Sequence, residues 1–298
     1  MPSGLIRSIS IEDSLHSSPV YTLSGRTPAG ISTNQITDYL LTRADYNLSQ
    51  QSLNLKQSQV QDEMDFLGGI GRSFKIMSEY QVEDPFAPES PLVVNIGCLT
   101  GTAYMTGLRT YFTAYSPLKR TIQGAPMASW SAMSGSFGRK YRSTGLDDLV
   151  LTGRAARPSI LVLRQVSDGP EISLDDAPDS MIGAVTPEKF KWLNENYNQP
   201  EKRKYHAHFS VIGPAGENWD KVWYACIVGS TQEQLMSGED KFRFAGRLGM
   251  GSVLGSKNIL AIVAYAEKDD YPKGDERLKP CLLYTSPSPR DATLSRMP

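Results

Sequence analysis

The sequence predicts an α+β fold, and three observations carry that prediction. Short runs rich in Val, Ile and Leu are typical of buried strands, and the segment that begins at Thr186 repeats apolar residues at helical spacing. These runs do not alternate strictly between strand and helix, as a parallel α/β sheet would require. The chain has 298 residues, 40% of them hydrophobic and 21% charged, with a formal net charge of −1, which is typical of a soluble globular protein.

The predicted elements begin near Leu40, after a loosely ordered extension over residues 1–40 that is rich in Ser, Thr, Gly and Pro. Helices are predicted from about Ile70 to Tyr80 and over 186–197, the second with Thr186 as its N-cap. Strands are predicted over 91–97, 108–115, 206–213, 221–229 and 258–265. The stretch 148–165 predicts a hairpin, because GRAARP supplies turn residues between two apolar runs.

Composition argues against several classes of protein. No stretch reaches the roughly 18 uninterrupted apolar residues of a membrane span, and the N-terminus lacks the pattern of a secretory signal, so we expect a cytoplasmic protein without a membrane partner. The near-neutral charge argues against nucleic acid as a partner. Cys98, Cys226 and Cys281 are isolated in the sequence, so no C-x-x-C pair is present to anchor zinc or an iron–sulfur cluster.

The segment CLLYTSPSPRDATLSRMP at the end of the chain differs from everything before it. It is polar and proline-rich, and it resembles translated sequencing-adapter read-through. We therefore expect residues 281–298 to be a non-native tail and residues 268–280 to begin a linker to missing domains. The natural chain is then expected to continue beyond Pro280, and a disordered natural tail is the alternative.

The stretch GRLGMGSVLG at 246–255 is the most distinctive motif. A dinucleotide site would need a strand directly before these glycines and a helix directly after them, whereas the following NILAIVAY predicts a strand. The glycine backbone, together with Arg243, Arg247 and Lys257, suits an anionic group such as a phosphate. A structural turn with solvated basic side chains is the alternative that the pattern leaves open.

Several blocks resemble one protein family, in the same order along the chain. They are FLGGIG (66–71), NIGCLTGT (95–102), TAYSPL (113–118), SGSFG (134–138), GLDDLVLTGRAARPSILV (145–162), VIGPAGEN (211–218) and RFAGRLGMGSVLGSKNILAI (243–262). Together they resemble the aldehyde ferredoxin oxidoreductase family of tungsten-pterin enzymes over roughly Leu40 to Ala264.

The resemblance implies an N-terminal domain, expected over 41–267, built of two mainly antiparallel sheets with a few short helices. Such a domain forms the base for a tungsten or molybdenum bis-pterin cofactor, while a [4Fe–4S] cluster belongs to later domains. The implied reaction, part of anaerobic metabolism, oxidises aldehydes to carboxylic acids, with ferredoxin as electron acceptor and a homodimer as an option. We expect this chain alone to be inactive, and no catalytic residue is assigned.

The resemblance also implies a set of site residues. Arg109 and Arg243 match arginines that contact the cofactor, and the carbonyl of Phe244 matches a ligand of Mg²⁺ between the pterin phosphates. Arginine and glycine suit such a site, because two phosphates need cations and close backbone approach. The expected cofactor-binding residues are Arg109, Ser134, Gly135, Arg243, Phe244, Ala245, Gly246, Arg247, Gly249 and Lys257.

Three positions depart from the family pattern. Ala132 stands where an asparagine supplies a further Mg²⁺ ligand, so a water or another carbonyl would have to replace it. Cys98 replaces a proline and is expected to be buried and structural, and Leu248 replaces a glycine beside the cofactor. Ala132 and Leu248 favour, as an alternative function, a reductase of carboxylic acids or aromatic thioesters with the same fold. A cofactor-free scaffold domain is the other alternative.

The remaining polar candidates are expected to be structural. His206 and His208 alternate along a strand and so share a face, but no third metal ligand is near them in the sequence. Asp147 and Asp148 are expected to be a solvated pair rather than an acid/base couple. Glu217 is expected in a structural turn, with cofactor contact as the alternative.

Overall fold

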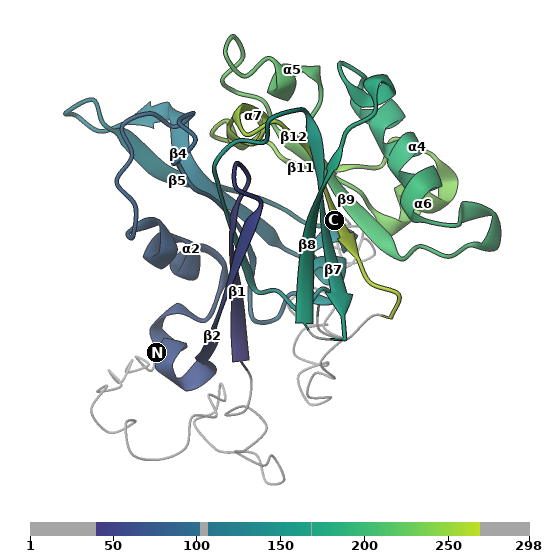
Figure 1. The fold of residues 1–298 in the computed structure, drawn as a ribbon, viewed down its shortest axis with the longest axis horizontal. Coiled ribbons are helices and arrows are strands. Elements are labelled where there is room, and N and C mark those ends of the chain that lie inside the picture. Colours follow the sequence, from purple (N-terminus) through teal and green to yellow (C-terminus); the bar gives the residue numbers. More distant parts are fainter. Residues whose placement is uncertain (1–39, 102–106, 168, 269–298) are drawn as a thin grey trace, which may run out of the picture.

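The computed structural model describes residues 40–101, 107–167 and 169–268. The extension expected before residue 40 and the linker and tail expected near the C-terminus lie outside these residues, apart from Leu40 and Lys268. Figure 1 shows two layers of strands with helices on their outer sides and at one end. Among the described residues, none of the helices combines the length and apolar character that crossing a membrane demands.

Each layer is a six-stranded sheet. The first has the order β2-β1-β6-β3-β4-β5 and comprises β1 (Leu40–Asn47), β2 (Ser52–Gln59), β3 (Leu92–Ile96), β4 (Thr110–Arg120), β5 (Pro126–Met133) and β6 (Asp148–Thr152). The second has the order β11-β10-β9-β12-β7-β8 and comprises β7 (Ser159–Val166), β8 (Gly169–Asp176), β9 (Ala207–Val211), β10 (Ile227–Gly229), β11 (Arg243–Ala245) and β12 (Ile259–Tyr265). Among the described strands, β1–β6 and β12–β7 pair in parallel and the other pairs are antiparallel. The predicted α+β class with two mainly antiparallel sheets is confirmed.

Short helices cover the sheets. They are α2 (Gly69–Met77), α3 (Ser136–Arg142), α4 (Thr186–Tyr197), α5 (Pro214–Glu217), α6 (Gln232–Ser237) and α7 (Met250–Ser256), with 3-10 turns η2 (Val60–Phe66), η3 (Asp179–Met181) and η4 (Pro200–Lys202). The main core lies between the sheets and includes Phe112 and Phe209. A smaller core lies under α2, where Ile76 packs with Val93. Strands β3 and β9 are buried along their whole length, and both are mostly apolar in the sequence, with Asn95, His208 and Ser210 as buried polar exceptions.

Several sequence predictions agree with these elements. Helix α4 has the predicted bounds, although Val185 rather than Thr186 is its N-cap and no side chain caps it. The strand predicted over 258–265 is β12. The strand predicted over 221–229 is shorter than expected, because only its last three residues pair, as β10.

The predicted hairpin over 148–165 was wrong. Strand β6 lies in the first sheet between β1 and β3, whereas β7 lies in the second sheet between β12 and β8. Both edges of each strand are therefore occupied by other partners, and GRAARP carries the chain from one layer to the other. Local turn chemistry could not reveal this, because the partners come from distant parts of the chain.

The glycine-rich stretch also differs from its prediction. Helix α7 takes up the second half of the stretch, including Gly251 and Gly255, so a helix lies between Gly249 and β12. Strand β11 precedes it, yet β11, β10, β9 and β12 are successive antiparallel neighbours, so β11 and β12 run in opposite directions. A dinucleotide site requires a parallel βαβ unit, and this segment does not form one.

Two glycines of α7 allow its backbone to touch other backbone. A Cβ added to Gly255 would lie 1.9 Å from the carbonyl oxygen of Gly216, and one added to Gly251 would lie 2.3 Å from that of Cys226. These positions are four residues apart and so share one helix face. The glycines therefore bring α7 against α5 and against the chain that leads into β10.

The crossing between the layers is held by a buried lysine. The Nζ of Lys257 donates hydrogen bonds to the carbonyl oxygens of Ser90 at 2.6 Å, Pro88 at 3.2 Å and Gly153 at 3.3 Å. Beside it, Nε of Arg154 donates to the carbonyl of Ser256 at 2.5 Å. Burial lowers the pKa of Lys257 to about 7, and the positive charge of Arg154 acts in the same direction.

A first prediction concerns the helix contact. Gly255→Ala should destabilise the protein by about 3 kcal/mol, because the new methyl group overlaps the Gly216 carbonyl and the two helices must separate. Gly71→Ala is the matched control, since Gly71 lies in α2 and its added methyl group would meet only a side-chain carbon of Phe66 at 3.8 Å. That control should be neutral or stabilising by up to about 1 kcal/mol. Urea denaturation measures both, and equal stability of the two variants would contradict the packing account.

A second prediction concerns pH. The unfolded chain binds the Lys257 proton with the ordinary pKa of 10.5, and the folded chain binds it with a pKa of about 7. The unfolded state therefore holds more protons between these values, and stability rises with pH by up to about 1.4 kcal/mol per pH unit. Denaturation of the wild type and Lys257→Met between pH 7 and 9.5 should show this rise only in the wild type. Exposed Lys191→Met should behave like the wild type, and parallel curves for wild type and Lys257→Met would refute the assignment.

Candidate cofactor-binding edge

The candidate site forms where one edge of each sheet meets the other. Strand β5 ends the first sheet and β11 ends the second. The backbone N–H of Arg247, two residues after β11, donates to Oγ of Ser131 on β5 at 3.1 Å. We call this region, comprising Arg109, residues 134–135 and residues 243–247, the β5–β11 edge.

Four of the expected site residues come together at this edge. Thr110 pairs with Met133 at the ends of β4 and β5, so Arg109 and Ser134 continue from directly paired positions. Gly135 has a φ of 113°, and a Cβ added there would lie 3.1 Å from Cγ of Arg243. The stem of Arg243 therefore lies across the glycine backbone, where a larger residue would displace it.

Two buried serines fix the loop that follows β11. Ser131 accepts from the N–H of Arg247, and Oγ of Ser116 donates to the carbonyl of Leu248 at 2.8 Å. Leu248 has a φ of 61°, a left-handed conformation that costs a non-glycine residue about 1 kcal/mol. Its side chain is half-buried and packs against the main core. The leucine therefore helps to anchor this loop.

The charge of the edge is positive. Arg109, Arg243 and Arg247 are all exposed. Within the described part of the chain, no carboxylate lies at ion-pair distance from any of them, and Nη1 of Arg243 donates to the carbonyl of Phe242 at 3.5 Å. Guanidinium groups that are not neutralised by the protein suit phosphate oxygens, which they bind through charge-assisted hydrogen bonds.

The other expected residues have different surroundings. Phe244 is 57% exposed, and Gly246 is exposed with open space beside it. Ala245 is buried opposite Ile227. A Cβ added to Gly249 would lie 2.1 Å from the carbonyl oxygen of Trp223, so this glycine has a packing role.

Lys257 is not brought to the edge. Its side chain is 1% exposed, and its ammonium is enclosed by the three carbonyls at the layer crossing. The sequence placed it with Arg243 and Arg247 because all three flank the same glycines. Helix α7 separates them, so Lys257 holds the fold together and does not face an external phosphate.

Sequence reasoning missed Arg142 of α3, which organises the loop leading to Arg109. Its Nη2 donates to the carbonyl of Gly97 at 2.9 Å, and its Nε donates to the carbonyl of Thr100. Oγ1 of Thr100 in turn donates to the carbonyl of Arg109 at 2.9 Å. Cys98 lies in this loop and is exposed, so the expectation that it is buried was wrong. The residues around Cys98 form a surface turn, so its side chain is not enclosed by a core.

The aspartate pair was also misjudged, because both residues are buried. The N–H of Thr42 donates to Oδ2 of Asp147 at 2.9 Å, and Asp148 forms an ion pair with Arg72. Burial raises the pKa of Asp148 to about 6, against the opposing charge of Arg72. Asn95 donates to Oδ1 of Asp148 at 3.2 Å. Both aspartates therefore belong to buried structural networks, and Asp148 is paired with an arginine of α2. The apolar run that follows them in the sequence was the available signal that they would be buried.

The histidines do not form a metal site. His208 is buried, with Nδ1 2.9 Å from Oγ of Ser230, while His206 precedes β9 and lies 3.2 Å from the carbonyl of Glu267. Across the described ranges, no group of three or more His, Cys, Asp or Glu side chains is placed to hold a metal ion. Glu217 forms an ion pair with buried Lys189 and accepts from the N–H of Gly183 at 2.8 Å, which agrees with its expected structural role.

Fold and site together define a two-sheet domain with a glycine-bearing, arginine-rich edge, a chemistry that suits phosphate oxygens. The chain belongs to the aldehyde ferredoxin oxidoreductase family, since residues 45–266 match the family model described as "Aldehyde ferredoxin oxidoreductase, N-terminal domain". The resemblance of the sequence blocks to this oxidoreductase family is thereby confirmed.

Individual relatives agree with this assignment. The chain is 32% identical over 200 residues to a tungsten-containing aldehyde ferredoxin oxidoreductase of Pyrococcus abyssi, which covers 67% of this chain and 28% of the relative. It is 28% identical over 210 residues to an aliphatic sulfonate oxidoreductase, WOR-like subunit, of Pyrococcus furiosus, which covers 67% and 30%. The chain thus spans less than a third of the length of these relatives.

A solved structure extends the comparison. The active site complex BamBC of benzoyl coenzyme A reductase, in complex with 1,5-dienoyl-CoA, matches with a TM-score of 0.62 and 25% sequence identity. The match covers 77% of this chain and 31% of that one. The two-sheet fold is therefore shared with the benzoyl coenzyme A reductase complex.

Proposed function

We propose that this chain is the cofactor-base domain of a tungsten bis-pterin oxidoreductase that oxidises aldehydes to carboxylic acids and passes electrons to ferredoxin. One observation carries the proposal: the β5–β11 edge presents three exposed arginines around an open glycine backbone, within a domain of a tungsten-containing family. The tungsten centre would supply the redox chemistry when bound, and this domain would supply orientation and charge.

The residues of the edge fit such a group. Arg243 and Arg247 would bind the pterin phosphates, and Arg109 would add a third cation from the other sheet. Gly246 would allow close backbone approach, because nothing but the Cβ of Phe244 lies within 4 Å of its missing side chain. The carbonyl of Phe244 would serve a bridging Mg²⁺. Ala132 pairs with Tyr111 inside the β4–β5 ladder, so a water would complete that ion's shell.

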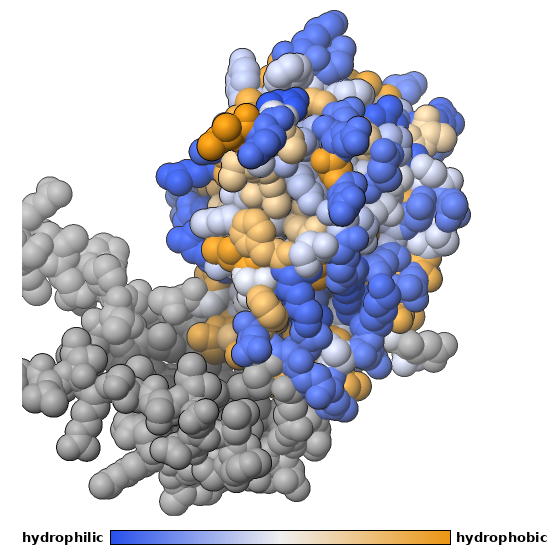
Figure 2. Space-filling view, turned by 90° about the vertical axis from the view of Figure 1, so that its left-hand side faces the viewer, coloured by the Kyte–Doolittle hydropathy of each residue, from blue (hydrophilic) through white to orange (hydrophobic). Residues whose placement is uncertain are grey.

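Exposed apolar surface supports the view that further domains complete the protein. The hairpin of β4 and β5 projects from the first sheet in Figure 1. Leu118, Ile122, Met127 and Trp130 of this hairpin are all exposed. Figure 2, which faces this side, shows patches of apolar side chains between hydrophilic ones. Such patches mark interaction surfaces. The [4Fe–4S] cluster and the acid/base groups would belong to the covering domains.

A binding prediction tests the edge. Pyrophosphate is a probe for two adjacent pterin phosphates, and Arg243→Ala and Arg247→Ala should each weaken its binding roughly tenfold, because each removes a charge-assisted contact. Arg157→Ala is the matched control, since this exposed arginine lies far from β11 in the second sheet and already pairs with Asp176 at 3.0 Å. Calorimetric titration measures the affinities. The same affinity in all four proteins would reject the edge as an anion site.

The reaction is tested by activity. The chain alone should not oxidise an aldehyde with a viologen dye as electron acceptor, because the cluster and the acid/base groups are proposed to belong to other domains. Turnover by this chain alone would contradict the proposal. The match to the benzoyl coenzyme A reductase complex favours a second candidate, reduction of carboxylic acids or aromatic thioesters. In a longer protein that joins this domain to the further domains proposed above, thioester reduction without aldehyde oxidation would establish that candidate. An extended protein that binds neither pterin nor tungsten would establish a scaffold.

A further inference from the structure

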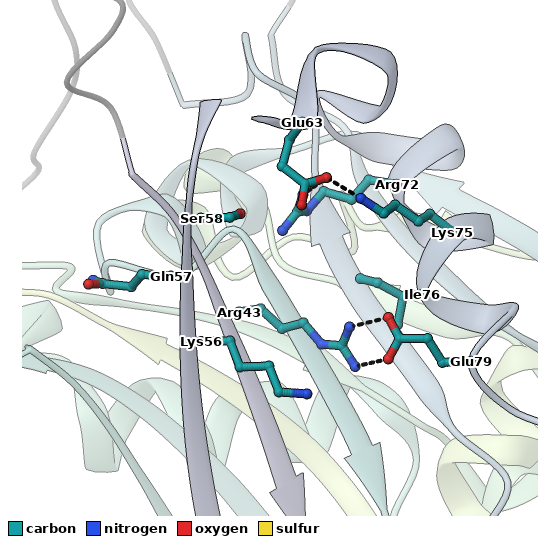
Figure 3. A pocket seen from close by; sticks show the side chains of 9 residues that line it. All are labelled: Arg43, Lys56, Gln57, Ser58, Glu63, Arg72, Lys75, Ile76 and Glu79. Carbon is teal, nitrogen blue, oxygen red and sulfur yellow. Dashed lines mark hydrogen bonds and ion pairs between the residues drawn. The ribbon is translucent and has the colours of Figure 1, made fainter. Parts of the chain in front are cut away.

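A second charged site lies at the opposite edge of the first sheet. Strand order places β2 at one end of this sheet and β5 at the other, with four strands between them. A pocket of about 200 Å³ lies between the β1–β2 hairpin and the segment formed by η2 and α2 (Figure 3). This volume equals that of roughly six or seven water molecules, so a small ligand group fits.

Positive charge predominates among the side chains that line this pocket. Arg43, Lys56, Arg72 and Lys75 line it, with Glu63 and Glu79 as the carboxylates. Arg43 and Arg72 are only 7% and 5% exposed, so two permanently charged guanidinium groups are part of its wall. Lys56 and Lys75 are more exposed and have ammonium groups that can move toward a ligand.

Two carboxylates outside the pocket lining orient the guanidinium groups. Oδ1 of Asp45 accepts from Nε of Arg43 at 2.6 Å, and buried Asp148 accepts from Nε of Arg72. The Nη atoms of both arginines are thereby left for groups in the pocket. Asp148 therefore orients Arg72 in the pocket wall and also belongs to the buried network beneath α2.

Glu79 occupies the position that a bound oxyanion would take. Nη1 and Nη2 of Arg43 donate to its two carboxylate oxygens at 2.6 and 2.8 Å, which is a bidentate pair (Figure 3). The Glu79 side chain is nevertheless 46% exposed, whereas that of Glu63, which binds Arg72 and Lys75, is 14% exposed. Glu79 can therefore turn into solvent while Glu63 stays.

We propose that this pocket binds a small oxyanion, a phosphoryl or carboxylate group, which displaces Glu79 from Arg43. The four cations and the four carboxylates Asp45, Glu63, Glu79 and Asp148 balance each other, so departure of Glu79 leaves one positive charge for the ligand. Arg43 supplies the bidentate contact, and Lys56 and Lys75 close the mouth. Because a free ligand must displace Glu79, which the chain holds beside Arg43, we expect weak binding that strengthens when Glu79 loses its charge.

The test titrates the full chain with inorganic phosphate and with malonate, each against chloride at equal ionic strength. Calorimetry should detect binding of at least one probe, and the tighter probe identifies a phosphoryl or a carboxylate ligand. Glu79→Gln should tighten binding roughly tenfold, because the competing charge is removed. Lys56→Gln and Lys75→Gln should each weaken it roughly threefold. Glu195→Gln and Lys191→Gln, on the exposed face of α4, are matched controls without effect.

Glu79→Gln is expected to raise the affinity and the two lysine variants to lower it, and this difference in direction distinguishes a binding site from a structural ion-pair cluster. If the cluster only braces the hairpin against α2, Glu79→Gln lowers stability without tightening binding, and the proposal is wrong. If Glu79→Gln does not fold, the two lysine variants decide, since binding that neither of them weakens overturns the proposal. Phosphate bound at the β5–β11 edge would not respond to Glu79→Gln, because Glu79 lines only the pocket, so the response to this variant is independent of that edge.

Discussion

The architecture depends on how the chain crosses between its two sheets. At this crossing Nζ of Lys257 lies within hydrogen-bond distance of three carbonyl oxygens. Arg154 adds hydrogen bonds to the carbonyls of Ser256 and Phe86. A buried polar group is costly unless it is hydrogen-bonded, so Lys257 fixes the loops that supply its partners. These contacts hold β6 and β7 in separate layers.

The placement of the layers decides where a site can form. With β5 ending one sheet and β11 ending the other, backbone and arginine side chains from distant parts of the chain meet at one edge. Ser116 and Ser131 tie the loop after β11 to the first sheet, and the left-handed Leu248 is kept in place by its packing. These contacts anchor the loop after β11 to the first sheet.

Membership in the family does not by itself fix the reaction. The relatives include proteins described as an aldehyde oxidoreductase and as an aliphatic sulfonate oxidoreductase, and a solved structure with the same fold is described as a benzoyl coenzyme A reductase. Each is more than three times as long as the matched region. The same N-terminal fold therefore occurs in proteins described by different reactions, so the fold alone does not specify the substrate.

The sequence by itself determined the fold class, helix α4, the buried strands and the family. Apolar periodicity and the sequence blocks that resemble the family can be recognised along the chain without knowledge of its tertiary contacts. The sequence also predicted Arg243 and Arg247 as anion-binding residues, and both are exposed in the structure. Only the tertiary structure decided that β6 and β7 separate, that Lys257 is enclosed, that Asp147 and Asp148 are buried, and that Gly251 and Gly255 serve helix packing. Each of these depends on partners far away in the sequence, and the free energy of burial is set by those partners rather than by neighbouring residues.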